Sequence, residues 1–226
     1  MMDKKRINIA IDGFSACGKS TMAQALAALL HFDYVDTGAM YRAITLFGIR
    51  KNILKEPFER IIPMLPDIHI KCAWTNNKNR TYLNDEDVSE AIRQPSVQNL
   101  VSQFSTIPAV RRQLVFLQQQ MAKGGGVVMD GRDIGSVVLP EAELKIFMTA
   151  RVDVRVQRRV RELLNKGIEI DAKAIEENLK MRDHIDSTRE DSPLIQAKDA
   201  RVLDNSDLSP DQQLNLALSW VNATIQ

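Results

Sequence analysis

A glycine-framed loop near the start of the chain has the residue types and the spacing that bind phosphate groups. Gly13 and Gly18 enclose four residues, and Lys19 and Ser20 follow directly, which matches the pattern G-x-x-x-x-G-K-[ST]. Glycines let the backbone turn tightly enough for successive N–H groups to face phosphate oxygens, and the lysine adds a positive charge over them. A serine at the last position is placed to hold Mg²⁺. These residues predict a polyphosphate site.

The residues on either side of this loop supply the elements that must position it. Residues 7–11 are apolar apart from Asn8 and predict a short buried strand, and the Ala/Leu-rich residues 21–30 predict a helix. An ordinary glycine turn between a strand and a helix is the alternative. The presence of both flanks favours the phosphate site, because strand, loop and helix are the context that the motif requires.

Composition and charge restrict the classes of protein that fit. The chain has 226 residues, of which 44% are hydrophobic and 26% charged, so we expect a soluble globular protein with one domain, or at most two. A formal net charge of +1 argues against nucleic-acid and membrane partners. Cys17 and Cys72 form neither a disulfide framework nor a metal-site spacing. With no apolar run long enough for a signal peptide or a membrane span, we expect a cytoplasmic protein.

A second group of functional residue types follows a predicted strand over residues 31–36. Asp36 or Thr37 can cap a helix over residues 38–50, because both side chains can accept hydrogen bonds from its free N–H groups. Arg42 lies one turn into this helix and can reach toward an anion near the helix start. The alternative is a solvated arginine at the surface.

The middle of the chain predicts a small antiparallel lobe over residues 56–94. Prolines interrupt the helical pattern, and residues 68–74 then alternate as in a half-buried strand. We expect a polar turn at residues 75–80, a returning strand at residues 81–83, and then a turn at residues 84–89 that leads to a short helix. His69 falls on the polar face of the first strand, and we assign it no catalytic role.

Two helices and a strand then lead to a run of charged residues. The helices are predicted over residues 95–104 and 108–122, and the apolar strand 127–130 ends in a carboxylate. The sequence Asp-Gly-Arg-Asp at residues 130–133 therefore lies where ligands gather in an open parallel sheet, beyond the carboxyl ends of the strands. A surface turn is the alternative.

An arginine-rich segment follows the next predicted strand, which covers residues 144–149. Five arginines occur within residues 151–161. Because the whole chain has balanced charge, we interpret this helical segment as a mobile flap over a polyphosphate rather than as a nucleic-acid site. A solvated helix face is the alternative.

The last part of the chain supplies further charged residues. A helix over residues 171–187 carries Arg182 and Asp186 near its end, and Arg189 follows at the same three-to-four spacing. These side chains either face one ligand or form a ladder of ion pairs. A strand over residues 201–204 and a closing helix complete the predicted order.

These motifs, in this order, resemble the bacterial cytidylate kinases over nearly the whole chain. The run Leu83-Asn84-Asp85-Glu86-Asp87-Val88-Ser89 and the pair Ile92-Arg93 resemble a further stretch of that family. The resemblance implies an α/β fold of the P-loop NTPase type, with three α/β/α layers, a central parallel sheet, an inserted NMP-binding lobe and a short helical lid. It also implies a monomer that phosphorylates CMP and dCMP, with ATP as donor and Mg²⁺ as cofactor.

The division of the chain that we expect from this resemblance is one kinase domain over residues 1–226. Its parts are a core of residues 1–55, 95–150 and 190–226, an inserted NMP-binding lobe of residues 56–94, and a lid with its following helix at residues 151–189.

The resemblance also implies roles for individual residues. The ATP phosphates would be bound by Gly13, Phe14, Ser15, Ala16, Cys17, Gly18, Lys19, Ser20 and Thr21, with Ser20 on the metal ion. The catalytic residues would be Lys19, Arg132, Arg158 and Arg159, and Arg155 would join the lid. CMP would be bound by Thr37, by Arg42, Arg132 and Arg189 at its phosphate, by Ser102, Arg111 and Asp133 at its base, and by Arg182 and Asp186 at its sugar.

Two rival functions stay open on the sequence alone. One is another small P-loop kinase, acting on UMP, AMP or shikimate; the inserted lobe and the base-reading residues argue against it. The other is a nucleotide-gated switch, which would hydrolyse one nucleotide slowly and need no acceptor site. Phosphoryl transfer to an acceptor distinguishes the switch from the kinases.

Overall fold

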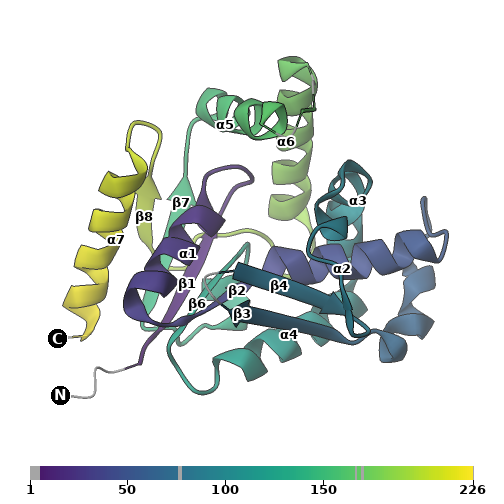
Figure 1. Cartoon of the computed structure of the whole chain (residues 1–226), viewed down its shortest axis with the longest axis horizontal. Helices are drawn as coiled ribbons and strands as arrows, with labels where there is room; N and C mark the ends of the chain where they lie inside the picture. Colours follow the sequence, from purple (N-terminus) through teal and green to yellow (C-terminus); the bar gives the residue numbers. More distant parts are fainter. Residues whose placement is uncertain (1–5, 76–77, 166, 169–170, 226) are drawn as a thin grey trace.

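A sheet of five parallel strands runs through the centre of the molecule (Figure 1). The computed structural model describes residues 6–75, 78–165, 167–168 and 171–225. In spatial order the strands are β2 (Asp33–Asp36), β6 (Val127–Gly131), β1 (Asn8–Gly13), β7 (Leu144–Thr149) and β8 (Arg201–Asp204). The predicted parallel sheet is confirmed.

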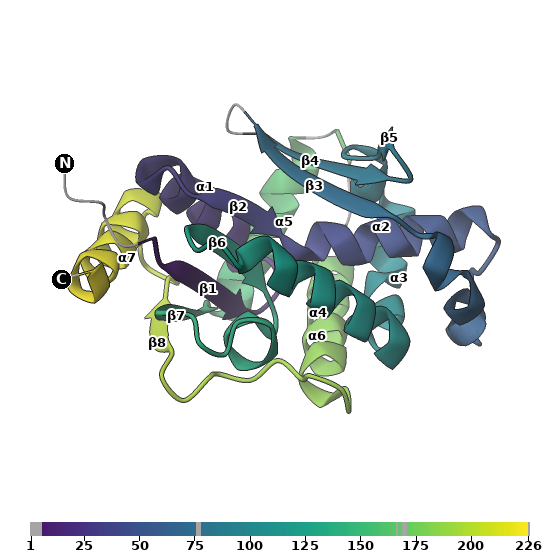
Figure 2. The same ribbon diagram turned by 90° about the horizontal axis from the view of Figure 1, so that it is seen from below.

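Helices cover both faces of this sheet because the side chains of its buried strands alternate between the faces. On β1, Ile9 and Ile11 belong to the core under α1 and α7, whereas Ala10 belongs to the core under α2, α3 and α4. These helices are α1 (Lys19–Leu30), α7 (Pro210–Ile225), α2 (Thr37–Arg50), α3 (Pro95–Ser105) and α4 (Pro108–Ala122). The result is the predicted three-layer α/β/α architecture (Figures 1 and 2).

Two further helices form a hairpin beyond the carboxyl ends of the strands (Figure 1). They are α5 (Val152–Leu164) and α6 (Ala172–Thr188), joined by a small apolar cluster of Leu163, Ile175 and Leu179. Arg155 of α5 pairs with Asp183 of α6 at 2.6 Å and donates to the carbonyl of Ser15 at 3.2 Å. These contacts attach the hairpin to the glycine loop.

A separate antiparallel sheet contains β3 (Ile70–Thr75), β4 (Lys78–Leu83) and β5 (Glu86–Asp87). The predicted hairpin is confirmed, but the polar turn predicted at 75–80 is wrong in extent. Trp74 pairs with Asn79, so the polar residues before residue 81 already belong to β4. Polar side chains are compatible with a strand where its face is solvated. Residues 76–77 of the predicted turn lie outside the described residues.

Two short helices that the sequence did not predict also belong to the fold: the 3₁₀ helix η1 (Phe58–Asp67) and the single π-helical turn η3 (Ile134–Val138). The short helix expected after residues 84–89 is confirmed as the 3₁₀ helix η2 (Ala91–Arg93). His69 is exposed between the buried Ile68 and Ile70, as its position in the alternating pattern predicted. Within the described residues, no helix is both long enough and apolar enough to cross a bilayer.

Candidate active site

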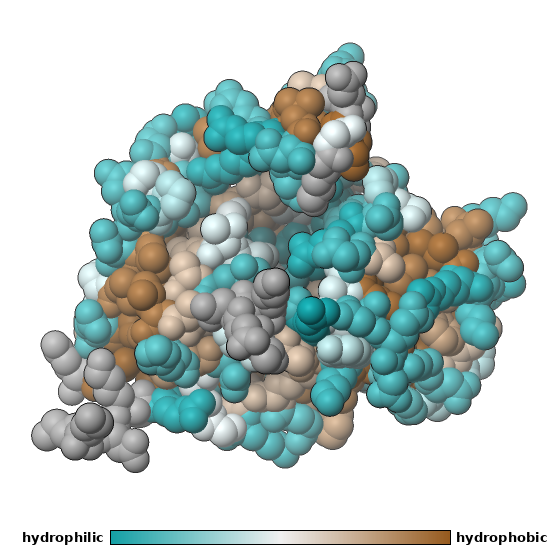
Figure 3. All heavy atoms as spheres, viewed as in Figure 1, coloured by the Kyte–Doolittle hydropathy of each residue, from teal (hydrophilic) through white to brown (hydrophobic). Residues whose placement is uncertain are grey.

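A cavity of about 400 Å³ lies at the carboxyl ends of the parallel strands. The surface is hollowed beneath the α5–α6 hairpin, and hydrophilic residues surround much of the hollow (Figure 3). Seven cationic side chains line the cavity: Lys19, Arg42, Arg93, Arg132, Arg159, Arg182 and Arg189. Five carboxylates also line it: Asp36, Asp130, Asp133, Glu162 and Asp186. The excess of positive charge suits a ligand that carries phosphate groups.

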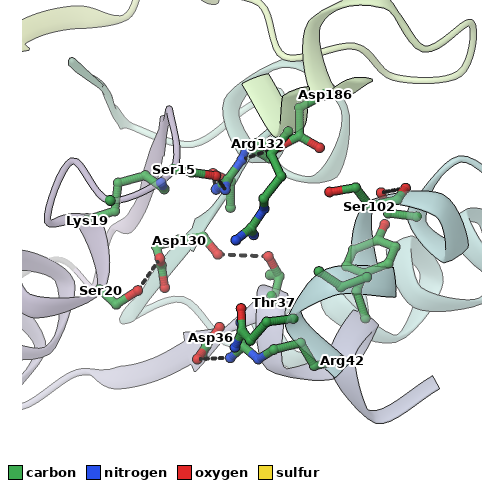
Figure 4. Close-up of a pocket in the computed structure, with 18 of the residues that line it drawn as sticks. Ser15, Lys19, Ser20, Asp36, Thr37, Arg42, Ser102, Asp130, Arg132 and Asp186 are labelled. Atoms are coloured by element: carbon green, nitrogen blue, oxygen red, sulfur yellow. Dashed lines mark hydrogen bonds and ion pairs between the residues drawn. The ribbon is translucent and has the colours of Figure 1, made fainter. Parts of the chain in front are cut away.

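The glycine loop holds Lys19 at the wall of this cavity. The helix after the loop begins at Lys19, two residues earlier than predicted, and the Nζ atom of Lys19 donates to the carbonyl of Phe14 at 2.7 Å. Gly13 is required here, because a Cβ at this position would lie 1.9 Å from the carbonyl oxygen of Met148. Burial, with a contribution from Arg132, lowers the pKa of Lys19. The loop thus presents a buried amine to the cavity (Figure 4).

The side chains of Ser20 and Asp130 lie together next to the glycine loop. Ser20 Oγ donates to Asp130 Oδ2 at 2.8 Å (Figure 4). The Tyr34 hydroxyl donates to Asp130 Oδ1 at 2.7 Å. Burial, and then the Asp36 carboxylate, raise the pKa of Asp130, so a cation beside it would be favourable. Thr37 Oγ1 donates to the Asp130 carbonyl at 2.7 Å and also lines the cavity.

These oxygens fit the requirements of Mg²⁺. The described residues contain no group of three or more His, Cys, Asp or Glu side chains that could hold a metal ion. Nucleotide-bound Mg²⁺ needs only one or two protein oxygens, since phosphates and water supply the others. Ser20 was predicted here, whereas Asp130 was missing from the predicted site residues. Its position at the end of a buried strand was the available signal.

The arginines of the cavity contain buried N–H groups that lack an acceptor. Arg132 Nε pairs with Asp186 at 2.8 Å, and Arg132 Nη2 donates to Ser15 Oγ at 2.8 Å. Within the described part of the chain, however, Nε of Arg42, Nε of Arg182 and Nη2 of Arg189 have no hydrogen-bond partner. Burial and the nearby Arg132 lower the pKa of Arg182 to about 10. An anionic ligand would supply the missing acceptors and offset the repulsion.

Arg42 is held at the entrance to α2. Its Nη2 pairs with Asp36 Oδ2 at 2.9 Å, and its side chain is only 16% exposed, so the solvated-surface alternative is wrong. Asp36 also caps α2, because its Oδ1 accepts from the Ala39 N–H at 2.8 Å. One carboxylate therefore starts the helix and orients the arginine.

The predicted base-reading residues come together from three segments. Arg111 of α4 forms a short ion pair with Asp133 and donates to the Ser105 carbonyl at 3.2 Å. Asp133 and Ser102 line the cavity, whereas Arg111 is 1% exposed and lies behind them. The structure thus places the Asp133 carboxylate at the cavity wall, with Arg111 paired to it from behind.

Other predicted residues lie outside the cavity wall. Gly13, Phe14, Cys17 and Arg158 do not line it, unlike Ser15, Ala16, Gly18, Thr21 and Arg159. Arg158 instead donates to the carbonyl and the side-chain oxygen of Asn205, both at 2.9 Å. Its predicted catalytic role stays a prediction. Arg159 pairs with Glu162 at 2.7 Å.

The residues at the end of α6 partly form the ion-pair ladder that was the alternative to a ligand site. Asp186 lies 3.8 Å from Arg189 but pairs most closely with Arg132. Burial by itself would raise the pKa of Asp186, but Arg132 and Arg189 outweigh it and hold this pKa below its usual range. Because Arg182, Asp186 and Arg189 all line the cavity, the ladder and the site are the same group of residues.

Tyr41 is a cavity residue that the sequence analysis missed. Its hydroxyl is buried and has no hydrogen-bond partner among the described residues, and the Arg111 guanidinium lies 5.4 Å from the centre of its ring. Burial raises the pKa of Tyr41, so the hydroxyl stays neutral. Its position directly before Arg42 was the only sequence signal.

The parallel sheet, the glycine loop and the arginine-lined cavity define a P-loop nucleotide-binding protein. A family model described as cytidylate kinase matches residues 9–223. The chain therefore belongs to the cytidylate kinase family.

Individual relatives agree with this assignment. The chain is 50% identical over 214 residues to a cytidylate kinase of Phocaeicola vulgatus, which covers 92% of this chain and 93% of the relative. It is 46% identical over 223 residues to a cytidylate kinase of Flavobacterium psychrophilum, and the match covers 96% of this chain and 99% of the relative. A crystal structure of an uncharacterized protein from Eubacterium ventriosum shares the fold, with a TM-score of 0.53, 13% identity, and coverage of 97% of this chain and 99% of that chain.

Proposed function

We propose that the protein transfers the γ-phosphoryl group of ATP to the phosphate of CMP or dCMP, which yields ADP and CDP or dCDP, with Mg²⁺ as cofactor. One observation carries this proposal: two sets of anion-binding groups face a single cavity (Figure 4). Lys19 and the loop form one set, and Arg42 and Arg189 belong to the other. Arg132 lies between the two sets, because it donates to Ser15 Oγ of the loop at 2.8 Å and pairs with Asp186. A donor and an acceptor can therefore meet there. Membership of the cytidylate kinase family supports the choice of acceptor.

The residues present fit a transfer that depends on position and charge. Phosphoryl transfer requires the acceptor oxygen, the phosphorus and the leaving oxygen in line, with the spreading negative charge matched by cations. Lys19 and Arg132 would supply this match. A nucleoside monophosphate is already ionised, so no general base is required. Arg159 on the hairpin would close over the phosphates and exclude water. When bound, Mg²⁺ would neutralise phosphate oxygens beside Ser20 and Asp130.

The base pocket has the chemistry to select cytosine. The exocyclic amine of cytosine donates hydrogen bonds, and a carboxylate such as Asp133 accepts them. Uracil presents a carbonyl oxygen at that position, which the carboxylate would repel. Arg111 and Arg189 hold this carboxylate in place, since both lie close to it.

The proposal also assigns roles to two segments of the chain. We assign residues 56–94 to the acceptor lobe and residues 151–189 to the lid and its following helix. We further expect a cytoplasmic monomer whose partners are ATP, CMP and dCMP, without nucleic-acid or membrane partners.

The test is an ADP-release assay with ATP and Mg²⁺, run in parallel with CMP, dCMP, UMP, AMP, GMP and shikimate. We expect turnover with CMP and dCMP to exceed turnover with the other acceptors. Equal rates with all acceptors would refute the base assignment. ADP release that needs no acceptor would favour the nucleotide-gated switch instead.

Replacement of Asp130 by asparagine is expected to raise the Mg²⁺ concentration for half-maximal rate about tenfold, because a neutral amide replaces a carboxylate beside Ser20. Initial rates over a Mg²⁺ titration at fixed ATP and CMP measure this change, and Mn²⁺ binding in the presence of ADP, followed by electron paramagnetic resonance, measures it without turnover. Asp67→Asn, at an exposed aspartate, is the control. An unchanged metal requirement would remove Asp130 from the proposed metal site.

Replacement of Tyr41 by phenylalanine is expected to leave the free energy of unfolding within about 0.5 kcal/mol, because the lost hydroxyl has no partner in the described part of the chain. The KM for CMP should rise several-fold if the nucleotide supplies that partner. Thermal unfolding and CMP titrations measure the two effects. Tyr82→Phe, outside the cavity lining, should change neither quantity. A destabilised Tyr41→Phe variant with normal KM would contradict a ligand role.

A further inference from the structure

Asp12 is a buried carboxylate that the proposed reaction does not use. It is the last residue but one of β1, it is 5% exposed, and it does not line the cavity. Its Oδ1 accepts from the Ile134 N–H and its Oδ2 accepts from the Gly135 N–H, both at 2.7 Å. Both carboxylate oxygens are therefore occupied by one short stretch of backbone.

Ile134 and Gly135 directly follow Arg132 and Asp133, two lining residues that we assign to the acceptor nucleotide. Strand β6 ends at Gly131, so Arg132 and Asp133 lie between the last sheet pairing and the first bonds to Asp12. The Asp12 side chain thus fixes the far end of this two-residue segment. Both residues of the segment line the cavity.

The donor side is held by different bonds. The backbone of Asp12 pairs with Gly131 of β6 and Phe147 of β7, and that of Gly13 pairs with Met148. These contacts hold the start of the glycine loop without the Asp12 side chain. Loss of the carboxylate should therefore disturb the acceptor segment more than the donor loop.

The electrostatic environment of Asp12 supports this role. Burial raises the pKa of Asp12 to about 7, while the two N–H bonds and the charge of Lys19 favour the ionised form and Asp133 opposes it. A charge that is costly to bury is retained here only with hydrogen bonds to both oxygens.

We propose that Asp12 is a positioning residue that places Arg132 and Asp133 relative to the glycine loop and so sets the affinity and the base selectivity for the acceptor. This inference rests on the proposed function. No contact between Asp12 and either nucleotide is required.

The first test is the Asp12→Asn variant. Its amide oxygen can still accept one N–H bond, but its NH₂ group would face the other N–H. We expect the KM for CMP to rise about tenfold, as for one lost hydrogen bond to a charged group. The preference for CMP over UMP should fall by a similar factor, and the KM for ATP should stay within about twofold, because the sheet pairings that hold the glycine loop are unchanged. Asp33→Asn, at the exposed start of β2, is the matched control.

A second variant changes Gly135, which donates one of the two backbone hydrogen bonds to Asp12. A Cβ on Gly135 would lie 3.3 Å from Asp12 Oδ2 and 3.1 Å from Lys145 Cδ, so Gly135→Ala crowds the bond while the carboxylate stays. We expect the same split, with the KM for CMP raised and the KM for ATP preserved. This variant decides the question if Asp12→Asn fails to fold.

Amide hydrogen exchange separates this inference from the proposed function. In the nucleotide-free Asp12→Asn protein, the amides of Ile134 and Gly135 should exchange about tenfold faster than in the wild type, whereas β1 amides keep their protection. Wild-type turnover of CMP tests the function itself. Unchanged exchange, an unchanged KM for CMP, or equal increases in both KM values would each overturn the positioning role.

Discussion

Replacement of Lys19 by methionine is expected to lower kcat about 10³-fold, the upper range for loss of one preorganised charge-stabilising donor. Methionine has a similar length but no charge. Lys19 is 5% exposed and its amine is held at 2.7 Å from the Phe14 carbonyl, so its position is set before the reaction. The measurement is kcat at saturating ATP, Mg²⁺ and CMP, with thermal unfolding to establish that the variant is folded.

The control for this prediction is Lys55→Met, which removes an exposed lysine away from the cavity and should leave kcat unchanged. A folded Lys19→Met protein that keeps more than about a tenth of the wild-type kcat would contradict the proposed charge stabilisation. Lys19 would then lower the barrier by less than about 1.4 kcal/mol, which corresponds to a tenfold change in rate.

Replacement of Arg111 by methionine is expected to reduce the free energy of unfolding by about 3 kcal/mol, because removing one partner of a buried ion pair leaves the other charge uncompensated. Arg111 is 1% exposed, and among the described residues Asp133 would keep only the ion pair with Arg189, at 3.6 Å. Urea unfolding followed by circular dichroism gives the free energy. The affinity for CMP should fall as well, since Arg111 orients the carboxylate that meets the base.

An exposed ion pair supplies the comparison. Glu86→Gln weakens the pair between Arg50 and Glu86, whose side chains are 42% and 56% exposed. This change should cost less than about 1 kcal/mol because solvent screens the pair. Equal losses in the two variants would mean that burial of the Arg111–Asp133 pair contributes nothing to stability.

Local patterns predicted most of the architecture. The strands β1, β2, β6 and β7 and the helices α2, α3 and α4 lie within a few residues of their predicted bounds, because apolar period and glycine or proline boundaries are local properties. The start of β4 was missed because pairing across the sheet, and not side-chain polarity, decides where a strand begins. Helix η1 was missed because its two prolines suggested a break.

The amino-acid sequence alone determined the glycine loop, the order of strands and helices, and the residue types that surround the candidate site. Only the tertiary structure decided that Asp12 reaches Ile134, that Arg111 supports Asp133 from behind, and that Arg158 faces Asn205 and not the cavity. The physical reason is separation along the chain. These partners are 122, 22 and 47 residues apart. They meet because β1 lies between β6 and β7 in the sheet and because α3, α4 and α5 pack against other elements of the fold. No local pattern in the sequence encodes these long-range contacts.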